Sequence, residues 1–170
     1  VSSGSASVDG STLTVTPVGD YNGDITVVVT VNDGSLVDSG SFTLSVTPVN
    51  DAPVLLSQYL NDFETDEDIA ISGDLEGLAI DIDGDTITYS VSVSSGSASV
   101  DGTILTVEPS QDFNGNITVT IIASDGFLTD SASSTLVVNP VNDAPYFITN
   151  SINSIDEDVS YSVDIQVSDI

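Results

Sequence analysis

The chain contains the same long segment twice, and this internal repeat limits its fold more than any other feature. Residues 1–10 read VSSGSASVDG, and the same ten letters return at residues 93–102. When residues 1–53 are aligned with residues 93–145, no gap is needed, most positions are identical and many differences are conservative. A repeat of about 92 residues has the size of one small β-sandwich domain. The sequence therefore predicts an array of similar domains.

Two further motifs define where the repeats begin and end. PVNDAP closes both copies, and DED occurs once in each of the two later parts of the chain, at residues 66–68 and 156–158. Because these partial repeats lie at the two ends, they are either pieces of longer repeats or parts that complete each other between neighbouring chains. We divide the chain into the C-terminal part of repeat 1 (1–53), the complete repeat 2 (54–145) and the N-terminal part of repeat 3 (146–170).

The charge of the chain excludes several classes of partner. It contains 27 acidic residues and no lysine, arginine or histidine, which gives a formal net charge of −27. Nucleic acid binding needs basic side chains that displace counterions from phosphates, and an anionic membrane surface would repel this chain. The sequence also lacks cysteine and any apolar run long enough to cross a membrane. We therefore expect neither nucleic acid binding nor membrane insertion in this segment.

Apolar and polar residues alternate along many short segments, as they do in half-buried strands. TLTVTP and ITVVVTV in repeat 1 correspond to ILTVEP and ITVTIIA in repeat 2. Valine, isoleucine, threonine and tyrosine dominate these segments, and such residues suit the surface of a pleated sheet. Asp-Gly and Asn-Gly pairs separate the segments and favour tight hairpin turns. Since no segment has a sustained helical period, the pattern predicts an all-β fold.

Repeat 2 is expected to hold seven strands, which predicts a Greek-key β-sandwich of the immunoglobulin or cadherin-like type. Without cysteine or tryptophan, it differs from the antibody version of this sandwich. Valine, isoleucine and leucine should form the core, with Phe113, Tyr89 and Phe127 in its larger gaps. The strands are expected near residues 54–60, 69–74, 86–93, 97–100, 103–108, 117–124 and 133–139.

Four motifs of repeat 2 together resemble the bacterial cadherin-like tandem repeat, a family of large calcium-dependent surface adhesins and other secreted multidomain proteins. The motifs are TDEDIAI, DIDGDTITYSV, PSQDFNGNITVTIIASDG and PVNDAP, in this order. The resemblance extends into both partial repeats, and VNDAP is also similar to the acidic linker of animal cadherins. It implies calcium ions at the junctions between domains.

The topology of such a sandwich would gather its acidic loops at two ends. The loops after the second and sixth strands share the N-terminal end, which the incoming linker reaches. The loops after the first and fifth strands, with Asp66, Asp68 and Asp112, share the C-terminal end with the outgoing linker and repeat 3. The predicted metal ligands at these junctions are Asn50, Asp51, Glu67, Asp81, Asp83, Asp85, Asp125, Asn142, Asp143, Glu157 and Asp169.

Calcium is the ion that these loops are predicted to bind. Two carboxylates about 5 Å apart repel each other by roughly 3 kcal/mol at an effective dielectric near 20, and without basic residues only protons or metal ions relieve this. Oxygen ligands alone suit Ca²⁺; Mg²⁺ ranks second because it needs a tighter octahedron, and Zn²⁺ prefers histidine and cysteine. The loop DIDGDTITYSVS is not an EF-hand, since its sixth residue is threonine and its twelfth is serine.

These features predict a spacer or stalk in a secreted or cell-surface bacterial adhesin or filament, made rigid by calcium outside the cell. VNDAP is a short linker whose proline restricts the backbone, and an ion held by two domains and the linker would fix their relative angle. The expected partners are neighbouring repeats of the same chain, with homophilic or head-to-tail self-assembly as a further possibility. A millimolar extracellular calcium supply fits sites of modest affinity.

The sequence also allows a different function, that of a carbohydrate- or protein-binding module of a secreted multidomain protein. A polysaccharide site usually presents exposed aromatic rings, and aromatic residues make up only 6% of this chain, with no tryptophan. An enzyme is not expected, because no histidine, cysteine or lysine is present to act as base or nucleophile. A glycosidase with paired carboxylates is the remaining catalytic alternative, although a sandwich repeat of this size predicts no cleft.

Overall fold

Two units make up the computed structural model, which describes residues 1–148, 156–162 and 164–168. The first unit contains Val1–Asp51 and Ile82–Asp85, and the second contains Ala52–Asp81 and Thr86–Ile170. Within the described residues, no helix is long and apolar enough to span a membrane.

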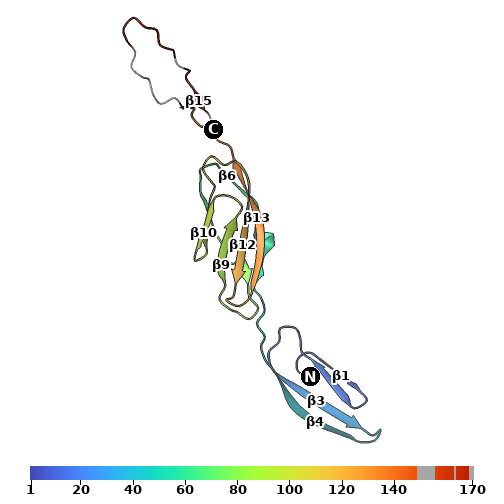
Figure 1. Ribbon diagram of the computed structural model, residues 1–170. Coiled ribbons are helices and arrows are strands. Elements are labelled where there is room, and N and C mark those ends of the chain that lie inside the picture. Colours follow the sequence, from blue (N-terminus) through green and yellow to red (C-terminus); the bar gives the residue numbers. More distant parts are fainter. Residues whose placement is uncertain (149–155, 163, 169–170) are drawn as a thin grey trace. The chain divides into compact units, whose positions relative to one another are not determined.

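The second unit is a sandwich of two β-sheets (Figure 1). One sheet has four strands in the order β6–β13–β12–β9, and the other has three strands in the order β10–β11–β7. This arrangement confirms the expected all-β sandwich of the immunoglobulin and cadherin-like type. The strands are β6 (Phe63–Asp66), β7 (Ile71–Asp74), β9 (Thr88–Val93), β10 (Ser97–Asp101), β11 (Ile104–Glu108), β12 (Gly115–Ser124) and β13 (Thr129–Asn139).

The hairpin of β12 and β13 carries most of the fully buried side chains of the repeat 2 core. The two strands are antiparallel, with Ile117 opposite Leu136. Ile117, Ile121 and Leu136 are at most 1% exposed, and they pack in one core with Leu105 and Val107 of β11. Because alternate side chains of a strand share a face, the alternating sequence pattern places these residues between the two sheets.

The three aromatic residues expected in the core differ in their positions. Phe113 and Tyr89 are half-buried against the core, and the Tyr89 hydroxyl accepts a hydrogen bond from the Ala79 N–H at 3.1 Å. The expectation for Phe127 is wrong, since this residue is 85% exposed. It lies in the turn between β12 and β13, where its N–H donates to Asp125 Oδ1 at 2.6 Å, and this turn holds the ring at the tip of the hairpin.

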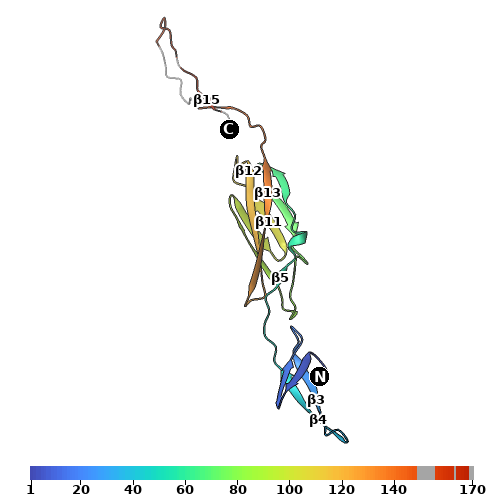
Figure 2. The same cartoon turned by 90° about the vertical axis from the view of Figure 1, so that its right-hand side faces the viewer.

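The first predicted strand, near residues 54–60, is much shorter than expected. Only β5 (Val54–Leu55) is extended, and it pairs with β8 (Ala79–Ile80) beside the start of β13 (Figure 2). There the Leu55 N–H donates to Asp130 Oδ2 at 2.8 Å. The chain then forms the short 3-10 helix η1 (Ser57–Tyr59) and becomes extended again only in β6, which pairs in parallel with β13. As a result, no strand of the described chain covers the outer edge of β7.

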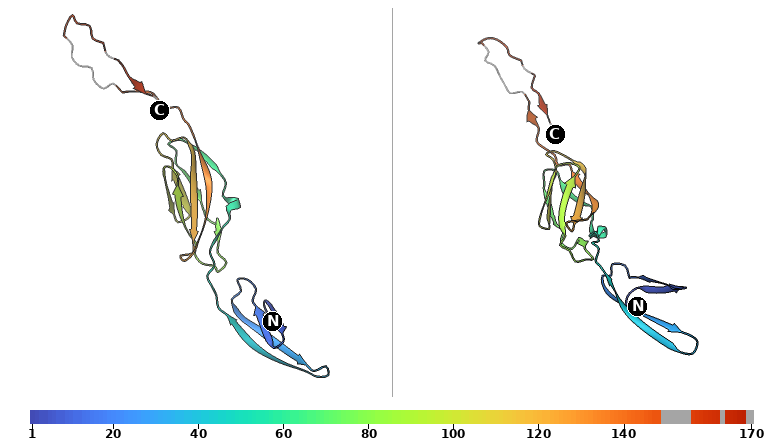
Figure 3. Two further views of the ribbon diagram at one scale, coloured as in Figure 1. Left: turned by 45° about the vertical axis from the view of Figure 1, so that its right-hand side comes forward. Right: turned by 60° about the horizontal axis from the view of Figure 1, so that its bottom comes forward.

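The first unit repeats the hairpins of the second (Figure 3). β1 (Ser5–Asp9) pairs with β2 (Thr12–Thr16), and β3 (Gly23–Asn32) pairs with β4 (Val37–Val46). The registers are those of β10–β11 and β12–β13; for example, Ile25 lies opposite Leu44 as Ile117 lies opposite Leu136. The related sequences therefore form the same hairpins in both copies.

One glycine fixes the turn that precedes the first hairpin of each copy. Gly4 and Gly96 have φ angles of +86° and +80°, a region that residues with a side chain rarely adopt. A Cβ atom would lie 2.1 Å from the Thr16 carbonyl oxygen at Gly4 and 2.2 Å from the Glu108 carbonyl oxygen at Gly96. Glycine is therefore required at both positions by backbone conformation and by space.

The beginning of repeat 3 contributes one small sheet. β14 (Tyr146–Phe147) pairs in antiparallel orientation with β15 (Val167–Ser168), and the Ile148 N–H donates to the Gln166 carbonyl oxygen at 3.0 Å.

Candidate metal centres

Two loops and the outgoing linker bring carboxylates together at the C-terminal end of repeat 2. Glu67 and Asp68 lie in the loop between β6 and β7, Asp112 lies in the loop between β11 and β12, and Asp143 follows β13. Asp68 and Asp112 have φ angles of +62° and +56°. Aspartate adopts this left-handed conformation more readily than most residues, which explains how these tight loops form without glycine.

Hydrogen bonds connect these segments directly. The Asp112 N–H donates to Asp68 Oδ1 at 3.0 Å, which joins the two loops. The Glu67 N–H donates to the Asn139 carbonyl oxygen at 2.9 Å, and Glu67 Oε1 accepts a short hydrogen bond from the Val141 N–H. Glu67 is only 7% exposed, so its carboxylate is held against the linker inside the protein.

The electrostatic environment of this cluster is unfavourable for the carboxylates alone. The pKa of Asp112 is raised above its ordinary value, first by desolvation and then by the negative charges of Asp68, Asp143 and Glu67. No lysine, arginine or histidine exists in the chain to compensate them. Buried charged groups in proteins are normally paired or bound to metal ions, and in this chain a cation must come from outside.

The raised pKa of Asp112 predicts a specific pH dependence in calcium-free buffer. Between the ordinary aspartate value of 3.8 and the raised pKa, the folded chain binds more protons than the unfolded chain. Asp112 therefore makes the folded state less stable as the pH rises through this window. Asp112→Asn removes the titration and keeps a residue that tolerates positive φ, so its stability relative to the wild type should increase as the pH rises.

Urea unfolding followed by circular dichroism at several pH values between 3 and 7 measures this difference. Carboxylates outside this cluster titrate equally in both proteins, so the variant minus wild-type difference reports on Asp112 and its coupling to Asp68, Asp143 and Glu67. If the stabilities of the two proteins changed in parallel with pH, the folded state would not raise the pKa of Asp112.

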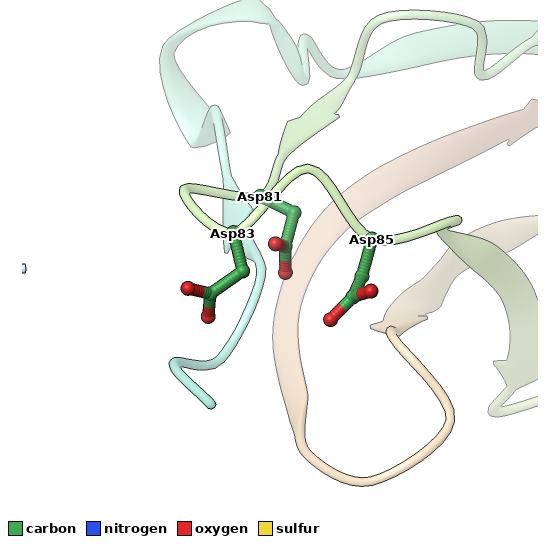
Figure 4. Close-up of side chains that lie close together, drawn as sticks. All are labelled: Asp81, Asp83 and Asp85. Atoms are coloured by element: carbon green, nitrogen blue, oxygen red, sulfur yellow. The ribbon is translucent and has the colours of Figure 1, made fainter. Parts of the chain in front are cut away.

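A second cluster lies on the loop that follows β8 and contains Asp81, Asp83 and Asp85. One carboxylate oxygen of each residue lies within 4.8 Å of those of the other two. Figure 4 shows the three side chains turned to the same side of the loop. Asp81 is half-buried, and the other two are exposed. The Asp51 N–H of the incoming linker donates to Asp83 Oδ2 at 2.8 Å, so this loop also contacts a predicted linker ligand.

The remaining predicted ligands occupy linkers and turns. Asn50 and Asn142 have the same local structure, since each side-chain amide donates to the carbonyl oxygen of the following aspartate, at 3.1 and 2.9 Å. Asp125 Oδ1 accepts hydrogen bonds from the Phe127 and Leu128 N–H groups, so this carboxylate supports the β12–β13 turn. Glu157 is exposed in a turn of repeat 3. Asp169 lies outside the described residues.

Asp68 and Asp112 belong to the C-terminal cluster but are absent from the ligand set predicted from the sequence. The sequence places both at this end of the sandwich, yet only the structure reveals that a hydrogen bond joins their loops. A signal was present in the repeats: Asp20 and Asp158 occupy the corresponding positions and also have positive φ angles. The repeated aspartate at this tight turn is therefore visible in the sequence.

The donor atoms of both clusters fit a hard divalent cation. They are carboxylate oxygens, and histidine and cysteine are absent from the sequence. Ca²⁺ accepts six to eight oxygen ligands in flexible geometry, whereas Mg²⁺ demands a near-ideal octahedron. A divalent cation would balance the charges of several carboxylates in each cluster.

The fold and the acidic ends define the class of the protein as an immunoglobulin-like β-sandwich repeat. The chain belongs to the bacterial Ig domain family, whose sequence profile matches residues 50–139. This membership agrees with the resemblance to cadherin-like repeats. Domains of this family are typically non-catalytic and typically occur in extracellular surface proteins.

Solved structures with partial similarity include three different kinds of protein. An endo-fucoidan hydrolase of glycoside hydrolase family 107 is 23% identical, with a TM-score of 0.43, over 76% of this chain and 20% of the hydrolase. Mouse protocadherin-24 EC1-3 is 16% identical, with a TM-score of 0.49, over 96% of this chain and 62% of that chain.

The third is a chimeric titin Z1Z2, which is 13% identical, with a TM-score of 0.33, over 79% of this chain and 72% of that chain. The chain thus spans about one fifth of the length of the hydrolase that it matches. No curated protein sequence matches the chain.

Proposed function

We propose that this chain is a calcium-rigidified spacer in the stalk of a secreted or surface-bound bacterial adhesin or filament. The observation that carries the proposal is the buried Glu67 carboxylate, which lies with Asp68, Asp112 and Asp143 in a chain that has no basic residue. A solvated acidic loop would not need to bury a carboxylate. A divalent cation gives this arrangement a physical reason.

The mechanism follows from the segments that carry the ligands. Glu67 already binds the backbone of Val141 at the start of the outgoing linker, and Asp143 lies two residues further on. At the other cluster, the backbone of Asp51 in the incoming linker binds Asp83. A calcium ion on these oxygens would hold each linker against the loops beside it. Without the ion, carboxylate repulsion would favour open, flexible linkers.

In an array of repeats, stiffening at each linker would determine the end-to-end distance of the whole array. Each added repeat would bring another linker that calcium stiffens, so the end-to-end distance of an array would scale with the number of repeats. The partners required are neighbouring repeats of the same chain. Millimolar calcium outside the cell would keep sites of modest affinity occupied.

Small-angle X-ray scattering of the full chain in 2 mM CaCl₂ and in EDTA tests the proposal. We expect a narrow distribution of end-to-end lengths with calcium and a broader one after chelation, with Asp143→Asn shifting the calcium curve toward the chelated one. Glu76→Gln, which changes the same charge at an exposed turn position, is the matched control and should behave as the wild type. Calcium binding by calorimetry without any change in flexibility would refute the spacer mechanism.

A further inference from the structure

A groove in the side of the repeat 2 sandwich has no role in the proposed calcium sites. Its volume is about 440 Å³, and it lies between the segment from Tyr59 to Glu64 and strand β7. Leu105 and Val107 of β11 and Ile121 of β12 line it, so the groove reaches the hydrophobic core from outside.

The groove lies beside a glycine of β7, Gly73, which has no side chain to fill the space. Ile71 and Leu75 face the core, and by the alternation of a strand Gly73 faces the core between them. A Cβ atom at Gly73 would meet nothing within 4 Å. In repeat 3 the corresponding segment is SYSVD in place of AISGD, with Val163 at the position of Gly73. In the aligned sequence, valine therefore stands in repeat 3 where repeat 2 has glycine.

The backbone beside the gap is an unpaired strand edge. β7 is the last strand of its sheet, and within the described residues no other strand pairs with its outer side. The Leu75 N–H donates to the Thr103 carbonyl oxygen at 2.8 Å, which sets the phase of the ladder between β7 and β11. Since hydrogen-bonding direction alternates in antiparallel pairs, the N–H and C=O groups of Ser72 point outward, away from β11.

The rim of the groove is acidic. Glu64 and Asp74 both line it and are exposed. Hydrogen bonds from the Glu76 N–H and then from Thr103 lower the pKa of Asp74, so this carboxylate is ionised at neutral pH. An occupant therefore needs an apolar side chain for the floor and positive charge for the rim. A second copy of this chain supplies no positive side chain, because the sequence contains neither lysine nor arginine.

We propose that the β7 edge of repeat 2 binds an extended segment of another protein that has an apolar residue between basic residues. The segment would pair with Ser72 as an added strand, place its apolar side chain in the gap at Gly73, and bring lysine or arginine to Glu64 and Asp74. Strand addition supplies affinity through main-chain hydrogen bonds, and side-chain pockets supply specificity.

Fluorescence anisotropy with defined peptides tests this site in the full chain at 2 mM CaCl₂. The probes are fluorescein-labelled peptides Thr-Thr-Val-Lys-X-Lys-Val-Thr-Thr with leucine, phenylalanine or alanine at X, and a leucine peptide with aspartate in place of both lysines; the lysines next to X lie on the same face of the added strand as Asp74. We expect leucine or phenylalanine to bind at least 10-fold more tightly than alanine. The aspartate-flanked peptide should show no binding.

Gly73→Val is the decisive variant, because it fills the gap with the residue of repeat 3. It should weaken binding of the best peptide at least 10-fold while its melting temperature stays at or above that of the wild type. Ser90→Val, an exposed position on the edge strand β9, is the matched control and should bind as the wild type.

Ser72→Pro provides a second test that does not depend on the gap. Proline is tolerated on edge strands when its missing N–H faces outward, and here it removes the donor that an added strand would use. It should also weaken binding at least 10-fold. Equal binding by wild type and Gly73→Val, or no binding of any basic peptide by the wild type, would overturn the proposal without affecting the calcium mechanism.

Discussion

Glu67→Gln should have opposite effects on stability in the presence and absence of calcium. In calcium, the variant should bind the ion on the order of 10-fold or more weakly at the C-terminal cluster, because the number of charged ligands sets calcium affinity. An ion at 100 times its Kd stabilises a fold by about 2.7 kcal/mol, so the wild type should gain roughly 10–20 °C in Tm from calcium, and the variant much less. In EDTA, the variant should be at least as stable as the wild type.

The stability that Glu67→Gln is expected to gain or keep in EDTA has a direct physical cause. Glu67 is 7% exposed and lies with Asp68, Asp112 and Asp143, so the substitution removes one acidic group from a cluster that has no basic residue beside it. Thermal unfolding by circular dichroism and calorimetric calcium titration measure both effects. Glu76→Gln, the exposed control, should follow the wild type in both buffers. A variant that loses the same stability in EDTA and in calcium would indicate that Glu67 acts only through its hydrogen bond to Val141.

Ile117→Ala should strongly destabilise the sandwich of repeat 2. Ile117 is fully buried and lies opposite the equally buried Leu136 in the β12–β13 hairpin. Truncation of a buried isoleucine to alanine typically costs about 2–5 kcal/mol, through lost burial and the cavity that is left. A domain of this size is stable by only about 5–15 kcal/mol, so the loss is a large fraction of the total.

Urea unfolding in saturating calcium, followed by far-ultraviolet circular dichroism, measures this loss. Val137→Ala on the opposite face of β13 is the control, since Val137 is 37% exposed and its truncation should cost much less. Equal destabilisation by the two substitutions would contradict the assignment of Ile117 to the core between the sheets.

The sandwich could be predicted because strand alternation and turn residues act locally. The alternation in ITVTIIA places Ile117, Val119 and Ile121 in the core, and the structure confirms this. The first strand was predicted wrongly because its pairing is not local: β5 pairs with β8, and β6 pairs with the distant β13. Phe127 was misplaced because hydrophobicity favoured burial, whereas the Asp125 turn determines where the ring lies.

The candidate sites could be predicted only to the level of loops. Chain topology indicated which acidic loops share an end of the sandwich. The burial of Glu67 and the hydrogen bond between Asp112 and Asp68 depend on the final packing of three segments, which no local pattern contains. The groove at Gly73 could not be predicted either. The sequence shows an isolated glycine in a strand, but it does not show the empty space beside that glycine.

The matching registers of β1–β2 and β10–β11 have a consequence for folding. Since these hairpins share sequence and geometry, β7 meets two nearly equivalent partners while the chain folds, the correct one about 33 residues away and the wrong one about 59 residues away. Loop-closure entropy favours the nearer hairpin by only about 0.5 kcal/mol. Correct assembly therefore depends on the few positions at which the hairpins differ, such as Ile104, where the first copy has Thr12. The duplicated hairpins therefore make domain-swapped misfolding a risk for this chain.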